Sequence, residues 1–193
     1  MTRLLRYACS ILAAGVVGCA AQAAEAHRPW ATKLEQSGVP NLHRVTTNLF
    51  RSAQPTAEGM KSIERLGIKT VISLRAFHSD EDEVESTTLK TERIRFNTWH
   101  AEDEDVVRFL KFVTATNTGP ILVHCLHGSD RTGMMIAIYR LAVEGWPKDE
   151  AIQEMTSANF GFHPLWKNLI EYLEKLDVEA LRKKAGIKFP PAK

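Results

Sequence analysis

Cysteine is scarce in this sequence, which contains three cysteines among 193 residues. Two of them, Cys9 and Cys19, lie in an N-terminal segment that we expect to be removed, which leaves Cys125 alone. A lone cysteine cannot form an intramolecular disulfide, even in a compartment that permits one. Its single thiol therefore calls for a functional explanation.

Long apolar runs are also absent, because no stretch reaches the roughly 20 residues that a bilayer-spanning helix needs. The best candidate, residues 8–18, follows Arg3 and Arg6 and leads to a possible cleavage site at residues 21–23. This pattern predicts a signal peptide over residues 1–23, and hence a periplasmic or secreted protein. A lipoprotein signal is the alternative, since Val-Val-Gly-Cys at residues 16–19 resembles a lipobox in which Cys19 is lipidated.

The sequence has no large charge of either sign, with 25 basic and 23 acidic residues and a formal net charge of +2. Removal of residues 1–23 takes away Arg3 and Arg6 and no acid, which leaves a neutral chain. Nucleic acids and anionic membrane surfaces attract basic proteins, so this balance supports neither as a partner. We expect membrane attachment only if Cys19 is lipidated.

The remaining residues have the composition of one globular domain, 44% hydrophobic and 25% charged. We predict a loosely held lead-in over residues 24–41, a domain over residues 42–185 and a tail over residues 186–193. Within the domain, short apolar runs alternate with segments of helical spacing. The predicted strands lie within residues 42–52, at 70–74, near 94–96 and at 121–123, and the later helices span residues 148–157, 164–176 and 178–185.

This alternation predicts an α/β fold, a single domain whose central, mostly parallel sheet is flanked by helices. Such sheets place their functional sites at the carboxyl end of a central strand. The run that follows the strand at residues 121–123 sets a cysteine and an arginine at opposite ends of one tight loop. It reads His124-Cys125-Leu126-His127-Gly128-Ser129-Asp130-Arg131-Thr132-Gly133.

A loop of this kind between a strand and a helix turns backbone N–H groups inward, which makes a nest for a tetrahedral dianion. The same positive field favours a thiolate, so Cys125 is the candidate nucleophile. Arg131 offers the planar, two-pronged donor that suits phosphate oxygens. We expect His124 to orient the loop and Thr132 to donate to the cysteine sulfur. The predicted substrate-binding residues are Leu126, His127, Gly128, Ser129, Asp130 and Arg131, and the chemistry needs no metal or other cofactor.

The loop resembles the His-Cys-x5-Arg-Ser/Thr signature of the protein tyrosine and dual-specificity phosphatases. Residues 48–55 (Asn-Leu-Phe-Arg-Ser-Ala-Gln-Pro) and 66–75 are similar to early segments of compact atypical dual-specificity phosphatases and small secreted bacterial tyrosine phosphatases. The resemblance spans about residues 39–175. It implies that Cys125 forms a phosphocysteine intermediate, that Arg131 holds the transition state, that Thr132 helps the sulfur leave, and that an upstream acid protonates the leaving oxygen.

The sequence departs from this family at the general acid. Many relatives carry an Asp just after a short strand, but the matching residues 96–101 contain none. Among the carboxylates that follow, we predict Asp103 as the acid, with Glu102 and then Asp105 as alternatives. The same acids would suit the start of a helix, and His100 could transfer the proton instead.

The loop side chains indicate the class of substrate. One histidine, His127, and one carboxylate, Asp130, make a poor site for a polyanion, which favours a single phosphate on tyrosine, or on serine or threonine in a shallow pocket. A phosphorylated protein or a small phosphorylated molecule is therefore the expected partner. An inositol-phosphate or other small-molecule phosphatase, or a phosphate-binding pseudophosphatase, remains an alternative.

Three further features are open at this stage. Arg51 and Arg75 could assist anion binding or could form structural ion pairs. The acidic stretch at residues 79–85 indicates a solvated helix or loop, because its acids lack the spacing of metal ligands.

Overall fold

The computed structural model of the chain describes residues 28–157 and 159–188, so the predicted signal peptide, the lipobox at Cys19 and the end of the tail lie outside the described residues. Its centre is a six-stranded sheet in the order β1-β2-β3-β6-β4-β5. β3, β6, β4 and β5 run parallel, whereas β1 and β2 are antiparallel to their neighbours. The strands are β1 (Thr32–Lys33), β2 (His43–Arg44), β3 (Leu49–Ser52), β4 (Thr70–Ser73), β5 (Lys90–Arg93) and β6 (Ile121–His124).

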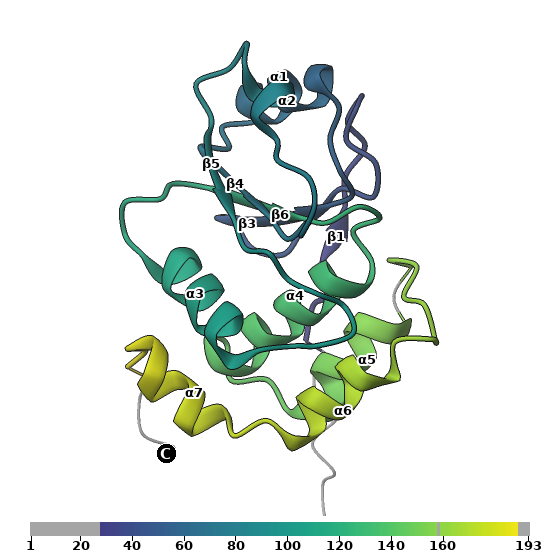
Figure 1. The fold of residues 1–193 in the computed structure, drawn as a ribbon, viewed down its shortest axis with the longest axis vertical. Coiled ribbons are helices and arrows are strands. Elements are labelled where there is room, and N and C mark those ends of the chain that lie inside the picture. Colours follow the sequence, from purple (N-terminus) through teal and green to yellow (C-terminus); the bar gives the residue numbers. More distant parts are fainter. Residues whose placement is uncertain (1–27, 158, 189–193) are drawn as a thin grey trace, which may run out of the picture.

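Helices cover both faces of this sheet, as Figure 1 shows. One face carries α1 (Ala57–Arg65) and α2 (Glu81–Val84). The opposite face carries α3 (Asp103–Thr114), α4 (Asp130–Ala142), α5 (Lys148–Ser157), α6 (Lys167–Lys175) and α7 (Val178–Ala185). This arrangement confirms the predicted α/β class. Within the described ranges, no helix combines the length and the apolar character that crossing a bilayer requires.

The central strand β6 contributes to a hydrophobic core on each side of the sheet. Leu122 lies in the core under α1, while Ile121 and Val123 lie in the larger core that α4 fills. Side chains of successive strand residues point to opposite faces, so a continuous apolar run is what a strand covered on both sides needs. α4 is buried along most of its length, which fixes the helix that follows the cysteine loop.

The first helix, α1, begins and ends at residues suited to those positions. The Thr56 hydroxyl accepts a hydrogen bond from the Gly59 N–H at 3.1 Å, which caps α1, and the chain turns at Gly67, where φ is +91°. A side-chain cap of this kind satisfies one of the free N–H groups at a helix start, and a glycine tolerates positive φ at its end. Met60 and Ile63 on its inner face are fully buried.

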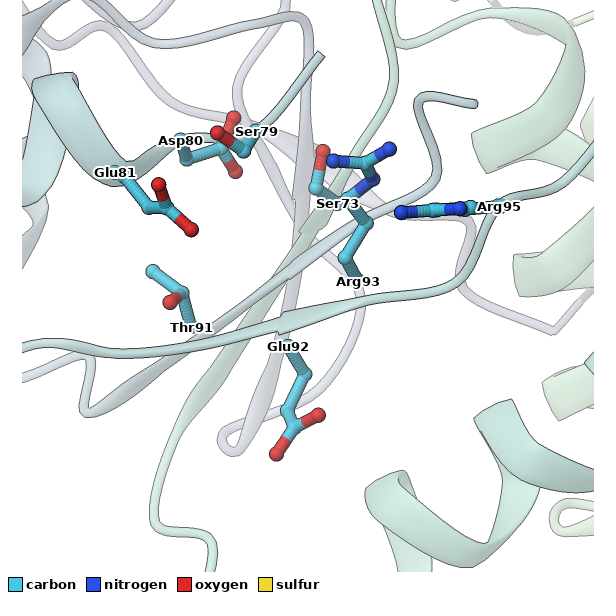
Figure 2. Close-up of a pocket in the computed structure, with 8 residues that line it drawn as sticks. All are labelled: Ser73, Ser79, Asp80, Glu81, Thr91, Glu92, Arg93 and Arg95. Atoms are coloured by element: carbon cyan, nitrogen blue, oxygen red, sulfur yellow. The ribbon is translucent and has the colours of Figure 1, made fainter. Parts of the chain in front are cut away.

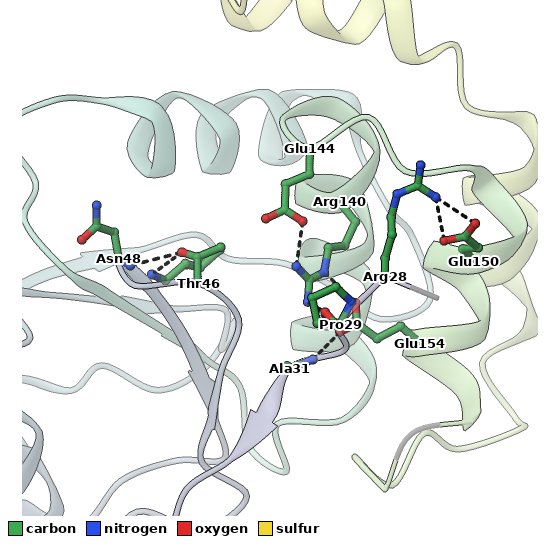
Figure 3. A network of polar contacts seen from close by, with 10 residues as sticks. Arg28, Pro29, Ala31, Thr46, Asn48, Arg140, Glu144, Glu150 and Glu154 are labelled. Carbon is green, nitrogen blue, oxygen red and sulfur yellow. Dashed lines mark hydrogen bonds and ion pairs between the residues drawn. The ribbon is translucent and has the colours of Figure 1, made fainter. Parts of the chain in front are cut away.

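Some boundaries differ from the prediction. The described part of the lead-in is not loosely held, because β1 pairs with β2 and the Ala31 N–H donates to Glu154 at 2.7 Å (Figure 3). The strand expected near residues 94–96 ends at Arg93, and the buried Ile94 and Phe96 pack just beyond it. The helix expected from residue 164 begins at Lys167. For the lead-in and the strand, pairing and burial against distant residues, rather than local pattern, decide the difference.

Candidate active site

The cysteine loop leaves the sheet at the carboxyl end of β6, between the ends of β3 and β4. His124 is in register with Ser52 on one side and with Ser73 on the other. Residues 125–129 then turn into α4. Gly128 has φ of +71°, and a Cβ there would lie 2.5 Å from backbone atoms of Ser52 and Ala53. Only glycine fits this turn, because both its conformation and its contact with β3 exclude a side chain.

Cys125 and Arg131, the two residues predicted to carry the chemistry, line one pocket of about 320 Å³. The Cys125 side chain is almost buried, and its Sγ accepts the Gly128 N–H at 3.2 Å. Arg131 donates to the Leu74 carbonyl at 3.2 Å, which draws its side chain towards the end of β4. The pocket is lined by Thr98, Cys125, Leu126, His127, Asp130, Arg131, His163, Leu165 and Trp166.

His124, at the start of the loop, makes a buried contact with Asp80 that the sequence did not predict. Its Nε2 lies 2.8 Å from the Asp80 carboxylate, and both side chains are buried. Asp80 also accepts from Gln54 at 3.0 Å, and Gln54 accepts from Arg75 at 3.0 Å. Burial alone would raise the pKa of Asp80. The hydrogen bond from His124, the charge of His124 and the hydrogen bond from Gln54 together act more strongly in the opposite direction, so the pKa of Asp80 is lowered.

The acidic stretch therefore differs in part from the prediction, because Asp80 is not solvated. Figure 2 shows the pocket of about 310 Å³ beside it, where Asp80 and Glu81 face Arg93 and Arg95. Among the described residues, His78, Asp80 and Glu83 have ligand atoms within 4.8 Å of one another. His78 contacts one oxygen of Glu83 at 3.0 Å and Asp80 lies 2.8 Å from His124, whereas the second Glu83 oxygen is buried with no hydrogen-bond partner among the described residues.

The remaining loop residues have distinct surroundings. The Ser129 hydroxyl donates to the Phe160 carbonyl at 2.7 Å, so this side chain braces the loop. The Asp130 carboxylate accepts both the backbone N–H of His163 and a contact from its Nδ1, each at 2.8 Å. The Thr132 hydroxyl is buried and has no hydrogen-bond partner among the described residues, so its predicted bond to the cysteine sulfur is not formed here. Leu126 and His127 are exposed at the mouth of the pocket.

The acid candidates do not line this pocket. Asp103 accepts from Tyr172 at 2.8 Å and from Lys184 at 2.6 Å, and it lines a different pocket between α6 and α7. These two donors lower the pKa of Asp103, so it holds no proton at neutral pH. The structure thus does not bring Asp103 to Cys125, and its catalytic role stays a prediction without geometric support.

The other candidates lie beside it. Glu102 is the N-cap residue of α3, makes no side-chain capping bond and has one contact with His100 at 3.6 Å. Burial, followed by the neighbouring charge of Glu102, raises the pKa of Asp105 in the first turn of α3. Thr98, in the same connection, does line the pocket, and Asn168 donates to its carbonyl at 2.8 Å.

Known phosphatases resemble this chain in sequence and in fold. Residues 31–169 match the family model described as DSP-PTPase phosphatase fused to NAD+ kinase. The dual specificity protein phosphatase TpbA of Pseudomonas aeruginosa strain UCBPP-PA14 is 33% identical over 180 residues, covering 90% of this chain and 80% of TpbA.

The solved structures agree with these sequence matches. The crystal structure of P. aeruginosa TpbA has a TM-score of 0.73 and 31% identity, covering 81% of this chain and 96% of that one, and a second TpbA structure contains phosphotyrosine. The catalytic core of the PP-IP phosphatase SIW14 of S. cerevisiae has a TM-score of 0.66 at 22% identity, covering 78% of this chain and 94% of that one, which shows a shared fold.

Proposed function

We propose that this chain, which belongs to the DSP-PTPase family and is a cysteine-dependent phosphatase of the tyrosine and dual-specificity type, removes single phosphates from protein side chains, phosphotyrosine above all. One observation carries the proposal: Cys125 and Arg131 line the same pocket, and the Gly128 N–H lies 3.2 Å from the cysteine sulfur. A Cys125 thiolate in this pocket can attack the phosphorus of a bound phosphate, and Arg131 can bind the phosphate oxygens.

The reaction proceeds in two steps. The Cys125 thiolate attacks phosphorus, so that an S–P bond forms as the bond to the leaving oxygen breaks, and a general acid protonates that oxygen. Water then attacks the phosphocysteine, giving inorganic phosphate and restoring the thiolate. Arg131 and the backbone N–H groups of the loop stabilise the charge on the transferring phosphoryl group in both steps. The Thr132 hydroxyl, which has no hydrogen-bond partner within the described part of the chain, can donate to the sulfur as it leaves.

We assign the general acid to Glu102 rather than to the predicted Asp103. Both oxygens of Asp103 are already bonded, to Tyr172 and Lys184. Glu102 lies one residue earlier, its side chain is 51% exposed, and it ends the connection that carries Thr98 to the pocket. Moving the Glu102 carboxyl group to the pocket would break no side-chain capping bond and only an exposed contact with His100.

The pocket walls support a phosphotyrosine substrate. Leu126, Leu165 and Trp166 supply apolar surface for an aromatic ring, with Leu126 43% and Leu165 80% exposed. The only carboxylate that lines the pocket within the described residues, Asp130, opposes binding of several phosphates. TpbA has been solved with phosphotyrosine, which points the same way.

A substrate panel tests this proposal. We expect kcat/KM for a phosphotyrosine peptide to exceed that for phosphoserine and phosphothreonine peptides and for inositol polyphosphates. Cys125→Ser should lose turnover on all of them, because a hydroxyl is not ionised at neutral pH. A preference for inositol polyphosphates would overturn the substrate class and leave the chemistry intact.

We propose further that the protein is exported to the periplasm or secreted. Support comes only from the sequence of residues 1–23, with Cys19 as a possible lipidation site. Cell fractionation of the full-length protein in a bacterium, with Cys19→Ser as the matched variant, tests this. Recovery of the uncleaved chain in the cytoplasm would contradict it, and release of a membrane-bound form by Cys19→Ser would identify a lipoprotein.

A further inference from the structure

Arg51 is a cation buried directly behind the cysteine loop. It comes from β3, and its side chain is 0% exposed. Its Nη2 donates to the Gly128 carbonyl at 2.7 Å, and its guanidinium lies 3.8 Å from the centre of the Phe160 ring. Within the described residues, its Nε and Nη1 have no hydrogen-bond partner. The chain therefore keeps an incompletely satisfied charge in its interior, which is costly unless a negative charge compensates it.

Two groups that can carry negative charge compensate the buried charge of Arg51, Glu154 more strongly than Cys125. Arg51 interacts electrostatically with Glu154 and Cys125, and with the like charge of Arg140. Glu154 is already bonded to Arg140 through both oxygens, at 2.8 Å each. Burial lowers the pKa of Arg51 to about 10, so the group stays a cation at neutral pH. A Cys125 thiolate, or a bound phosphate, would add to the compensation that Glu154 shares between Arg51 and Arg140.

Gly128 connects the two residues directly. Its carbonyl accepts from Arg51 and its N–H donates to Cys125 Sγ at 3.2 Å. The carbonyl and the N–H belong to the two peptide groups on either side of the Gly128 Cα, so Arg51 restrains the loop on the carbonyl side of the glycine whose N–H reaches the sulfur. We infer that Arg51 is a positioning residue that holds the Gly128 carbonyl and, through its buried charge, favours the thiolate form of Cys125. This inference rests on the cysteine mechanism proposed above.

Other groups act on Cys125 as well, and the variants below leave them in place. The titratable or charged side chains around it, from β6, the loop, α4 and the α5–α6 connection, are His124 with Asp80 behind it, His127, Asp130, Arg131 and His163.

Three variants of the full-length protein separate the charge of Arg51 from its hydrogen bond. Arg51→Lys keeps the charge, Arg51→Gln keeps a neutral donor, and Arg51→Met keeps neither. Arg65→Gln, at an exposed ion pair on α1, is the matched control. The rate of iodoacetamide alkylation of Cys125 is measured against pH, and peptide mass spectrometry separates Cys125 from Cys9 and Cys19. The parallel measurement is kcat/KM on a phosphotyrosine peptide.

We expect the midpoint of the alkylation profile to rise by about 1 to 3 pH units in Arg51→Gln and Arg51→Met, the range for loss of a nearby opposite charge. Arg51→Lys and Arg65→Gln should stay close to the wild type. At neutral pH, kcat/KM should fall at least tenfold in the two neutral variants. Unchanged midpoints in both neutral variants would overturn the inference.

If the neutral variants do not fold, Arg51→Lys decides the question. A wild-type midpoint in folded Arg51→Lys supports the role of the charge, whereas a midpoint raised by a full unit contradicts it. Failure of the proposed function is a separate result, because it would show as turnover by Cys125→Ser whatever the Arg51 variants do.

Discussion

At the scale of single residues, the central question is which side chain protonates the leaving oxygen. The sequence places four candidates between residues 100 and 105, and spacing alone could not separate them. The deciding contacts come from Tyr172 and Lys184, about 70 and 80 residues further along the chain, which occupy both oxygens of Asp103. By contrast, Cys125, Arg131 and Gly128 were predictable, because each meets a local requirement of one tight loop.

Glu102→Gln should therefore lower kcat on a phosphotyrosine peptide by about 10²- to 10⁴-fold, the usual size of a general-acid contribution. An activated aryl phosphate, whose phenol leaves without a proton, should lose far less. Asp103→Asn is the matched control and should leave both rates within a few-fold of the wild type. Equal losses on both substrates in Glu102→Gln would show that Glu102 is not the general acid. A large, substrate-dependent loss in Asp103→Asn would assign that role to Asp103.

At the scale of elements, the cysteine loop depends on supports that approach from both neighbouring strands. Arg51 of β3 holds Gly128, and Asp80, at the start of α2 after β4, holds His124. The sequence predicted the strand, loop and helix, but not Asp80, because a carboxylate in an acidic run gives no local sign that it is buried. Only the pairing of β4 with β6 brings Asp80 under the loop.

Asp80→Asn should reduce the free energy of unfolding by about 1–3 kcal/mol at neutral pH, since it weakens a buried hydrogen-bonded contact with His124. The folded-state pKa of Asp80 is lowered, so its contribution is present above the ordinary value of about 3.9 and is lost as the pH falls through the lowered value. Urea unfolding of both proteins across this range measures the difference. A difference that does not shrink in acid would argue against an ionised Asp80.

At the scale of the whole molecule, the described lead-in is fastened to α4 and α5 by one polar network (Figure 3). Arg140 bonds both Glu154 and Glu144, Glu154 also accepts from the Ala31 N–H, and Arg28 pairs with Glu150 at 2.8 Å. The α/β class followed from alternating strand and helix patterns, but this attachment did not, because residues more than 100 positions apart meet only in the fold.

Glu154→Gln should destabilise the protein by about 3 kcal/mol, the lower end of the range for breaking a buried pair, because Glu144 still compensates part of the Arg140 charge. Thermal unfolding measures the loss of stability. The control is the exposed ion pair between Lys175 and Glu171, where Lys175→Gln should change stability by less than about 0.5 kcal/mol. Similar effects of the two variants would show that the lead-in network contributes little.

The most direct test of the mechanism is rapid-quench trapping of the intermediate. Wild-type protein mixed with an activated aryl phosphate should release a burst of one equivalent of phenol per active site, and peptide mapping of the quenched protein should find the phosphoryl group on Cys125. Cys125→Ser should show neither. A phosphoryl group on any other residue, or steady turnover by Cys125→Ser within tenfold of the wild type, would contradict a phosphocysteine mechanism.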